Sequence, residues 1–278
     1  MQPQSTAAEY WGKRSGYAAN WYQFCAPYIN ERITGNPNLA PTPWAFSITG
    51  KPKNLLEIGC LDGAKLSKLL ESGLIERGSG VDVAAAAIER GRLAHPHIPL
   101  DVLDLNAPVG LQTDAYDVIF SNGVLHHIEN IETCVRALYG ALQPSGWLIA
   151  SEFTGPRRYA YTDEEIALIR QGQDLLPEEI RGAPFHPDQL ASKLQNDPSE
   201  AISTDVIEPT LRMVFDEVTS KPFGGNVLMR ALTRLFFTNY DSENPVHVEA
   251  VTRLHALDIA RSQTRSHHTY FLCRRWAA

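Results

Sequence analysis

Apolar runs and helical repeats alternate through the middle of the chain. Five short apolar runs have the length and composition of buried strands, at roughly 53–58, 79–83, 99–103, 116–121 and 146–152. Three stretches between them repeat apolar residues at helical spacing, at roughly 63–73, 84–94 and 131–142. This alternation predicts a parallel sheet with right-handed crossover connections.

The two ends of the chain depart from this pattern. Residues 1–50 are rich in aromatic side chains, which predicts either a helical collar packed on the core or a lid over bound ligands. Prolines divide residues 154–200 into short pieces, and Thr162 with Glu165 has the pattern of a capping box that opens a helix. The remainder predicts strands near 213–221 and 269–273 and helices near 226–238 and 246–261.

Residues 54–82 have the pattern of a nucleotide-binding strand–helix–strand unit. Gly59 ends a buried strand, and Asp82 ends the next one, where an acid can bind ribose hydroxyls. A pyrophosphate site needs glycine where Leu61 stands, and the carboxylate of Glu57 repels phosphate but attracts a cation. The segment therefore favours an adenosine that carries a positive charge and no phosphate, and S-adenosylmethionine has these properties.

The motif Glu57-x-Gly59-x-x-x-Gly63, followed by Asp82, resembles the class I S-adenosylmethionine-dependent methyltransferases. In that family the first acid and the glycines line the methionine end of the cofactor, and the second acid holds the ribose. The resemblance implies cofactor contacts for Glu57, Gly59, Cys60, Gly63, Asp82 and Val83. It also implies a doubly wound, seven-stranded, mostly parallel α/β sheet whose last strand is antiparallel.

The third and fourth predicted strands end in further candidate cofactor residues. The family uses an acid after the third strand to bind the adenine amine, and Asp104, followed by Leu105, matches that position. The alternative for Asp104 is a solvated acid in a turn. Ser121 and Asn122 end the fourth strand, at the sheet edge where ligands of such folds bind.

Two adjacent histidines follow the fourth strand, where a substrate is expected. Histidine is an effective general base near neutral pH, but at most one of His126 and His127 need be catalytic; the other then packs as a structural residue. Glu152 ends the fifth strand and could orient a histidine or bind substrate; in some resembling sugar methyltransferases an acid here assists deprotonation. Its alternative is a rim carboxylate that caps a helix or pairs with Arg157 or Arg158.

Candidate substrate-binding residues lie in the two segments outside the core. After the fifth strand a Gly-Pro turn leads to Arg157 and Tyr159, which we expect to face the substrate, although solvated surface arginines are the commoner case. Trp11 and Tyr17 are expected to cover it from the N-terminal side. We therefore predict one methyltransferase domain over 1–278, made of a lid at 1–50, a cofactor-binding core at 51–153, an inserted cap at 154–200 and a C-terminal core at 201–278.

Composition narrows the class of protein. The net charge of −7 over 278 residues argues against a general nucleic-acid binder. The four cysteines form no Cys-x-x-Cys pair, so buried free thiols are expected. We expect no catalytic metal, since no adjacent acid pair follows the fourth strand. Without an 18-residue apolar run we expect a cytoplasmic protein with no membrane insertion, while the apolar helix at 226–238 is either core or a homodimer interface.

The sequence thus predicts an enzyme that moves a methyl group from S-adenosylmethionine to a heteroatom, preferably a hydroxyl, of a small molecule, releasing S-adenosylhomocysteine. Segments 155–163, 197–201 and 223–225 are similar to a subset often associated with glycan or secondary-metabolite pathways. One alternative is an NAD-linked oxidoreductase, which is disfavoured by Leu61, by Glu57 and by the lack of a Tyr-x-x-x-Lys pair. Another is a non-catalytic nucleoside-binding protein.

Overall fold

A single sheet of seven strands organises the part of the chain that the structure describes. The structure is a computed structural model that describes residues 7–12 and 21–277; Tyr17 lies outside the described residues. The strands are β1 (Leu55–Ile58), β2 (Gly78–Asp82), β3 (Leu100–Val102), β4 (Tyr116–Asn122), β5 (Leu142–Phe153), β6 (Glu217–Gly224) and β7 (His268–Arg274).

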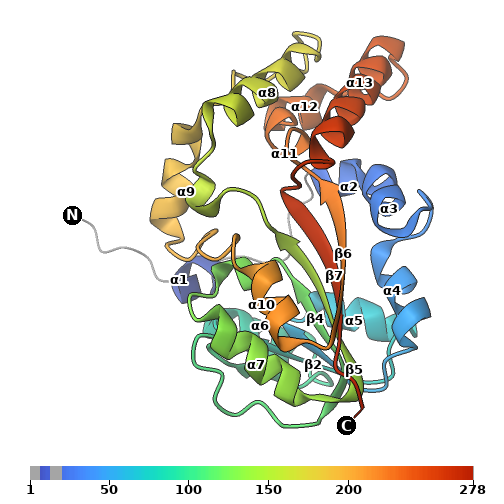
Figure 1. The fold of residues 1–278 in the computed structure, drawn as a ribbon, viewed down its shortest axis with the longest axis vertical. Coiled ribbons are helices and arrows are strands. Elements are labelled where there is room, and N and C mark those ends of the chain that lie inside the picture. Colours follow the sequence, from blue (N-terminus) through green and yellow to red (C-terminus); the bar gives the residue numbers. More distant parts are fainter. Residues whose placement is uncertain (1–6, 13–20, 278) are drawn as a thin grey trace.

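The strand order is β3-β2-β1-β4-β5-β7-β6 (Figure 1). The first five strands pair in parallel, and β7 runs antiparallel to both of its neighbours, β5 and β6. The predicted seven-stranded, mostly parallel sheet with an antiparallel last strand is therefore confirmed. The strand order reverses between β1 and β4, which is where open α/β sheets bind ligands.

Helices cover both faces of the sheet. One face packs against α2 (Trp21–Phe24), α3 (Ala26–Thr34), α4 (Pro41–Thr49), α5 (Ala64–Glu71) and α6 (Ala85–Ala94). The other face packs against α7 (Ile131–Ala141) and α10 (Ile207–Val214). Successive strand residues point to opposite faces, so Leu55 joins the first core and Leu56 the second.

Four further helices form an upper lobe beyond the carboxyl ends of β4 and β5 (Figure 1). Its members are α8 (Asp163–Asp174), α11 (Leu228–Ala231), α12 (Arg234–Asn239) and α13 (Pro245–Ser262). The predicted capping box is confirmed, because Thr162 Oγ1 accepts from the Glu165 amide while the Glu165 carboxylate accepts from the Thr162 amide. The division into lid, core, cap and C-terminal part stays a prediction; α11–α13 share the lobe with α8.

Two expectations for the C-terminal part were wrong in detail. The single helix expected at 226–238 is two short helices, because Thr233 is extended at ψ 177° and interrupts the turn. Leu228 and Phe236 from the two pieces are both buried, so much of this segment is core. The strand expected at 213–221 begins later, since α10 occupies the preceding residues.

Two expectations from composition can be compared with the structure. All four cysteines are buried and free, as the sequence predicted. Among the described residues, no helix combines the length and apolarity that a membrane-spanning segment needs.

Candidate active site

A cavity of about 290 Å³ opens at the carboxyl ends of β1, β2 and β4. Its wall contains seven of the predicted cofactor residues or their neighbours: Gly59, Leu61, Asp82, Val83, Asp104, Leu105 and Asn122. The opposite part of the wall contains His127 and Ser199, and Ala8 and Trp11 close it from α1 (Ala7–Gly12). The cavity therefore joins the predicted cofactor residues to one of the predicted catalytic histidines.

At the end of the cavity where the nucleoside is expected, backbone amides hold the carboxylate of Asp82. Asp82 Oδ2 accepts from the Leu61 amide at 2.9 Å, and Oδ1 accepts from the Ala84 amide at 2.8 Å. Burial raises the pKa of Asp82, and these backbone amides oppose the rise. Each oxygen keeps a second lone pair, so the carboxylate can still accept from a ribose diol.

The loop after β1 has a conformation that few side chains permit. Gly59 has φ +65°, and a Cβ at this position would lie 2.3 Å from Val124 Cγ2. Leu61, where a pyrophosphate motif has glycine, also adopts a left-handed φ of +50°. That conformation costs a leucine about 1–2 kcal/mol. The amide of Leu61 then reaches Asp82, so the loop keeps its shape without the glycine.

Glu57, in β1, is a buried carboxylate that does not line the cavity. Its side chain is 4 % exposed, and Oε2 has no hydrogen-bond partner in the described structure. Burial raises the pKa of Glu57 to about 7; Lys65 opposes this, while Asp82 and Asp62 add to it. An unpaired buried carboxylate suits a cationic group, such as the ammonium of a bound amino acid.

Three predicted cofactor residues besides Glu57 do not line the cavity either. Cys60 is buried, and its Sγ packs so close to Gly80 that a Cβ there would lie 2.6 Å away. Gly63 turns the chain into α5 at φ +73°. Ser121 is turned away, because its Oγ donates to Glu152 at 2.8 Å. The expected direct contact of Ser121 with the cofactor is thus not what its geometry favours.

Glu152 organises the loop that follows β4. One oxygen accepts from Ser121 Oγ and from the amides of Val124 and Leu125, at 2.8, 3.0 and 3.1 Å. The other oxygen lies 2.9 Å from His126 Nδ1. Glu152 thus contacts a histidine, and among the described residues it bonds to neither Arg157 nor Arg158. His126 is buried and does not line the cavity.

His127 is the histidine that reaches the cavity. Its Nδ1 lies 3.0 Å from Ser199 Oγ, and Ser199 Oγ donates its only hydrogen to Asp197 Oδ1 at 2.6 Å. Nδ1 must then carry the imidazole proton, which leaves the Nε2 lone pair free. Burial and the neighbouring His126 lower the pKa of His127 to about 3, with Glu200 opposing, so the ring is neutral at pH 7. Trp11 packs edge-on against it, with ring centroids 5.5 Å apart.

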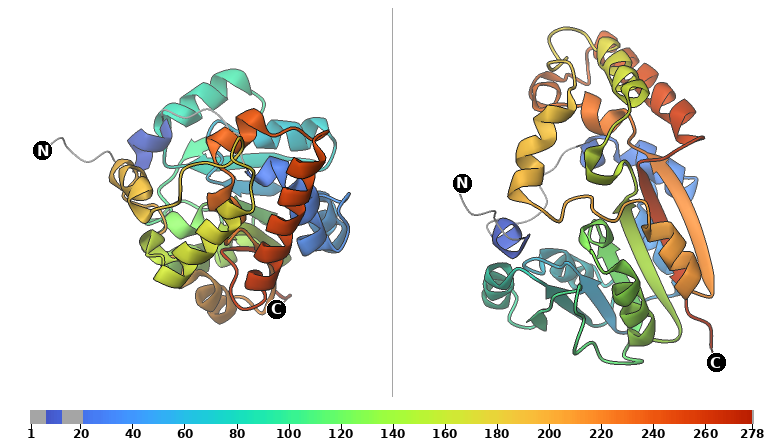
Figure 2. Two further views of the ribbon diagram at one scale, coloured as in Figure 1. Left: turned by 90° about the horizontal axis from the view of Figure 1, so that it is seen from above. Right: turned by 60° about the vertical axis from the view of Figure 1, so that its left-hand side comes forward.

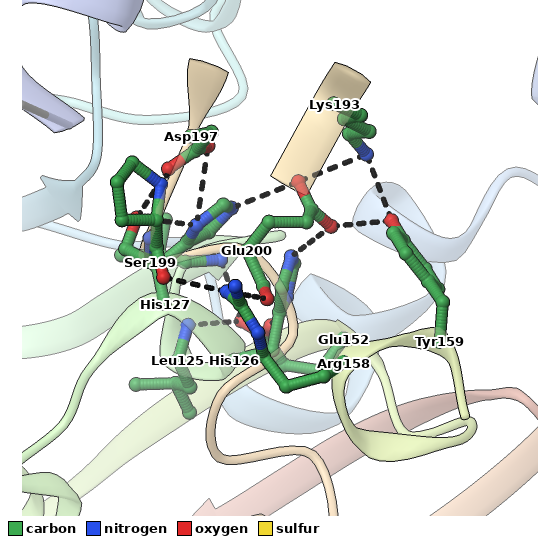
Figure 3. Close-up of polar contacts among 12 residues, drawn as sticks. Leu125, His126, His127, Glu152, Arg158, Tyr159, Lys193, Asp197, Ser199 and Glu200 are labelled. Atoms are coloured by element: carbon green, nitrogen blue, oxygen red, sulfur yellow. Dashed lines mark hydrogen bonds and ion pairs between the residues drawn. The ribbon is translucent and has the colours of Figure 1, made fainter. Parts of the chain in front are cut away.

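Glu200 joins the two histidines to the cap (Figure 3). Its carboxylate is 3.7 Å from His126 Nε2 and 3.9 Å from His127 Nε2. Lys193 Nζ donates to it at 2.9 Å and Tyr159 Oη at 2.5 Å. Burial raises the pKa of Glu200, but His126, His127 and Lys193 outweigh this and hold it well below its usual value. The carboxylate is therefore ionised at neutral pH.

The chain is strained where it approaches this cluster. Arg158 and Tyr159 both adopt left-handed φ values, +53° and +57°. The Arg158 amide donates to Ala201 O at 2.7 Å, and its guanidinium donates to the carbonyls of Pro198 and Glu200 at 2.6 and 3.1 Å. Strain of this kind persists where surrounding contacts over-determine it, which is common at functional sites.

The predicted substrate-facing residues divide into two groups. Tyr159 is buried and bonds to Glu200, and Trp11 lines the cavity, so both belong to the site. Arg157 is exposed and is not part of the cavity wall, because Arg158 takes the inward position in the turn. Figure 2 shows α1 beside α9 (Ala191–Asn196), and Gly12 O accepts from Arg90 of α6 at 2.6 Å. Helix α1 thus contacts α6 and forms part of the cavity wall.

Four participants were not among the residues predicted from sequence: Lys193, Asp197, Ser199 and Glu200. They reach the histidines from about 70 positions downstream, and no local periodicity indicated this. The only signal was the turn sequence Asp197-Pro-Ser-Glu, which resembled a subset of the family. Asp197 is fully buried beside a histidine, a placement that sequence alone does not indicate.

The cluster also has the composition of a metal site. Ligand atoms of His126, His127 and Glu200 lie within 4.8 Å of one another. However, Lys193 brings a positive charge to within 2.9 Å of the same carboxylate. These contacts favour a hydrogen-bonded cluster, and the expectation of no catalytic metal stays a prediction.

Comparison with known proteins gives the family. A profile described as a methyltransferase domain matches residues 10–196, more than half of the chain. The chain belongs to this methyltransferase family. The match confirms the predicted class I relationship and decides against the NAD-linked alternative. The cofactor is S-adenosylmethionine, and the buried carboxylates Glu57 and Asp82 fit its ammonium and ribose.

The methyltransferase is similar to curated proteins over part of their length. It is 29 % identical over 103 residues to an uncharacterised methyltransferase of Mycobacterium bovis, covering 37 % of this chain and 51 % of the relative. It thus spans about half the length of that relative. It is 35 % identical over 103 residues to a tRNA U34 carboxymethyltransferase of Shewanella putrefaciens, covering 36 % of this chain and 31 % of the relative.

Solved structures share the fold of the methyltransferase. A plantazolicin methyltransferase in complex with S-adenosylhomocysteine has a TM-score of 0.51 at 11 % identity, over 92 % of this chain and 88 % of that one. A sarcosine dimethylglycine methyltransferase from Galdieria sulphuraria has the same TM-score and identity, over 84 % of each chain. At this identity the likeness concerns the fold alone.

Proposed function

We propose that this methyltransferase moves the methyl group of S-adenosylmethionine to a hydroxyl oxygen of a small molecule. The observation that carries the proposal is the free Nε2 of His127. It belongs to a neutral imidazole that lines the cofactor cavity and is held at Nδ1 by Ser199. An alcohol loses a proton as it is methylated, and this nitrogen would accept it; burial and His126 make the imidazole a weak base, and the Glu200 carboxylate opposes that effect.

When bound, S-adenosylmethionine supplies a methyl group on a positively charged sulfur; the acceptor oxygen bonds to the methyl carbon as the sulfur–carbon bond breaks, leaving S-adenosylhomocysteine. The sulfonium needs no activation, so the chain mainly positions the acceptor. The hydroxyl proton passes to His127 Nε2. Glu200, 3.9 Å away, then stabilises the imidazolium.

The remaining predicted catalytic residues take positioning roles in this proposal. Glu152 holds His126 by Nδ1 and also ties down the amides of Val124 and Leu125. This fixes the loop that carries His127. At the cofactor end, we propose that Glu57 faces the methionine ammonium, Asp82 the ribose and Asp104 the adenine amine, with Asn122 at the junction of the two ends.

The acceptor class rests on charge and on one relative. The net charge of −7 favours a small molecule over tRNA, the substrate that the Shewanella relative's name indicates. A hybrid PKS-NRPS synthetase of Talaromyces variabilis is 31 % identical over 141 residues, covering 48 % of this chain and 3 % of that protein. This supports a secondary metabolite as acceptor. A sugar is the other acceptor class that we propose, and we propose a cytoplasmic protein that is a monomer or a homodimer.

A screen with S-adenosylmethionine labelled on the methyl group tests this function. Pools of alcohols, phenols, sugars and amines are incubated with the protein, and labelled products are identified by mass spectrometry. We expect label in an O-methyl product. Label confined to amines would overturn the oxygen assignment while leaving the methyltransferase activity in place.

A further inference from the structure

A second cavity, of about 240 Å³, lies between the helices α2–α4 and the face of the sheet that they cover. Its floor is a row of side chains across three paired strands, since Asn122 of β4 pairs with Ser151 of β5, and Ser151 pairs with Tyr270 of β7. Asn122 lines both cavities. The second cavity therefore adjoins the cofactor cavity at the carboxyl end of β4.

One cation lines this second cavity. Lys65, in the first turn of α5, places Nζ 3.7 Å from the ring centroid of Phe120. Within residues 7–12 and 21–277, Nζ has no hydrogen-bond acceptor and no carboxylate within ion-pair distance. Burial lowers the pKa of Lys65, while Glu57 opposes this from a distance. Lys65 is half-buried, and an ammonium that lines a cavity with an aromatic ring as its partner can still donate to an anion.

Glu57 and Lys65 together form a pair of separated opposite charges. Glu57 pairs in register with Phe120, so its carboxylate and the ring beneath Lys65 lie side by side on one face of the sheet. Among the described residues, Glu57 Oε2 is a buried acceptor without a donor, and Lys65 Nζ contacts the Phe120 ring and no oxygen acceptor. A group that carries a carboxylate fits the lysine, and an adjacent ammonium fits Glu57.

We propose that the second cavity is a carboxylate-binding site whose anchor is Lys65. The carboxylate belongs either to the amino-acid end of S-adenosylmethionine or to the acceptor; both bring the same charge-assisted hydrogen bond to Nζ. The other lining side chains supply neutral contacts: Tyr22, Asn30, Thr42, Asn122, Ser151 and Tyr270. The inference concerns binding and does not depend on which acceptor atom is methylated.

Calorimetric titration of Lys65→Met separates the two sources. Lys68→Met is the matched control, since Lys68 is an exposed lysine of the same helix. Each protein is titrated with S-adenosylhomocysteine, then with 5′-methylthioadenosine, which lacks the amino-acid end. A third titration uses benzoate as a carboxylate probe on protein saturated with S-adenosylhomocysteine. Lys65→Arg, which keeps the charge, is expected to retain most of the binding.

If the carboxylate is the cofactor's, Lys65→Met weakens S-adenosylhomocysteine at least about tenfold and leaves methylthioadenosine unchanged. If it is the acceptor's, S-adenosylhomocysteine is unaffected and benzoate binding to the wild-type protein is lost in Lys65→Met. Equal behaviour of Lys65→Met and Lys68→Met with all three probes overturns the site. Thermal unfolding checks that each variant is folded. If Lys65→Met does not fold, Lys65→Gln is used in its place. Because these titrations measure only binding, their outcome can be interpreted even if the protein does not methylate hydroxyls.

Discussion

The two ends of the cofactor cavity are built in different ways. At the nucleoside end, backbone amides hold the Asp82 carboxylate, and Gly59 turns the chain where a Cβ would meet Val124. At the acceptor end, ionisable side chains hold one another, with Glu200 between two histidines, a lysine and a tyrosine. A backbone-built site depends little on neighbouring side chains, whereas each member of a side-chain cluster depends on the others. The difference suggests that one end of the cavity binds the cofactor and the other end binds the acceptor.

The sharpest test of this contrast is removal of the imidazole at the acceptor end. His127→Ala is expected to lower turnover about 10²–10⁴-fold, because loss of a general base has that effect. Turnover is measured at saturating S-adenosylmethionine with the acceptor that the labelled screen identifies. His97→Ala, at an exposed histidine, is the control and is expected to leave turnover unchanged.

His126→Ala is expected to act differently. It leaves Glu152 buried without its imidazole partner, so its main effect is a lower melting temperature. Small and equal losses of turnover in both histidine variants would remove the proton-acceptor role and favour an amine or carbon acceptor.

At the nucleoside end the largest effect is expected on affinity. Asp82→Ala should weaken S-adenosylhomocysteine at least about tenfold, since charge-assisted hydrogen bonds to a ribose diol contribute about 1.5–3 kcal/mol each. Calorimetry measures this, with Asp101→Ala at the exposed end of β3 as control. Unchanged affinity in a folded Asp82→Ala protein would show that the nucleoside lies elsewhere.

Glu57 gives the cofactor end a pH dependence. Its pKa of about 7 means that the free protein carries a proton there below pH 7, under the combined influence of burial, Lys65, Asp82 and Asp62. Binding an ammonium requires the ionised form, so affinity for S-adenosylhomocysteine should fall as pH drops from 8 to 6, by up to about tenfold per unit below the pKa. Titrations across this range should show the fall in the wild-type protein and a flat profile in Glu57→Gln. Parallel profiles would contradict the assignment.

The smallest expected effect concerns closure. Ala8 and Trp11 line the cavity, whereas Trp21 is buried against Phe223 and His268. We therefore expect α1 to gain hydrogen-exchange protection when S-adenosylhomocysteine binds, while α2 and α3 show little change. Equal protection of α1 in both states would show that α1 is packed on the core and does not act as a lid.

The contrast between the two ends also explains what sequence could and could not predict. Gly59, Asp82 and Asn122 end consecutive or adjacent strands, so strand periodicity and one loop motif place them together. The pairing of Glu152 with a histidine followed from neighbouring strand ends, but not the choice between His126 and His127. That choice depends on Ser199 and Asp197, whose burial is decided by how the cap folds back.

The measurement that tests this division most directly is the affinity of two variants for S-adenosylhomocysteine, determined side by side by calorimetry. His127→Ala should bind within about threefold of the wild-type protein, a change below 1 kcal/mol, while Asp82→Ala binds at least about tenfold more weakly. That result would show a cofactor end that works without the acceptor-end histidine. Loss of affinity in His127→Ala as large as in Asp82→Ala would contradict it and make His127 a cofactor residue.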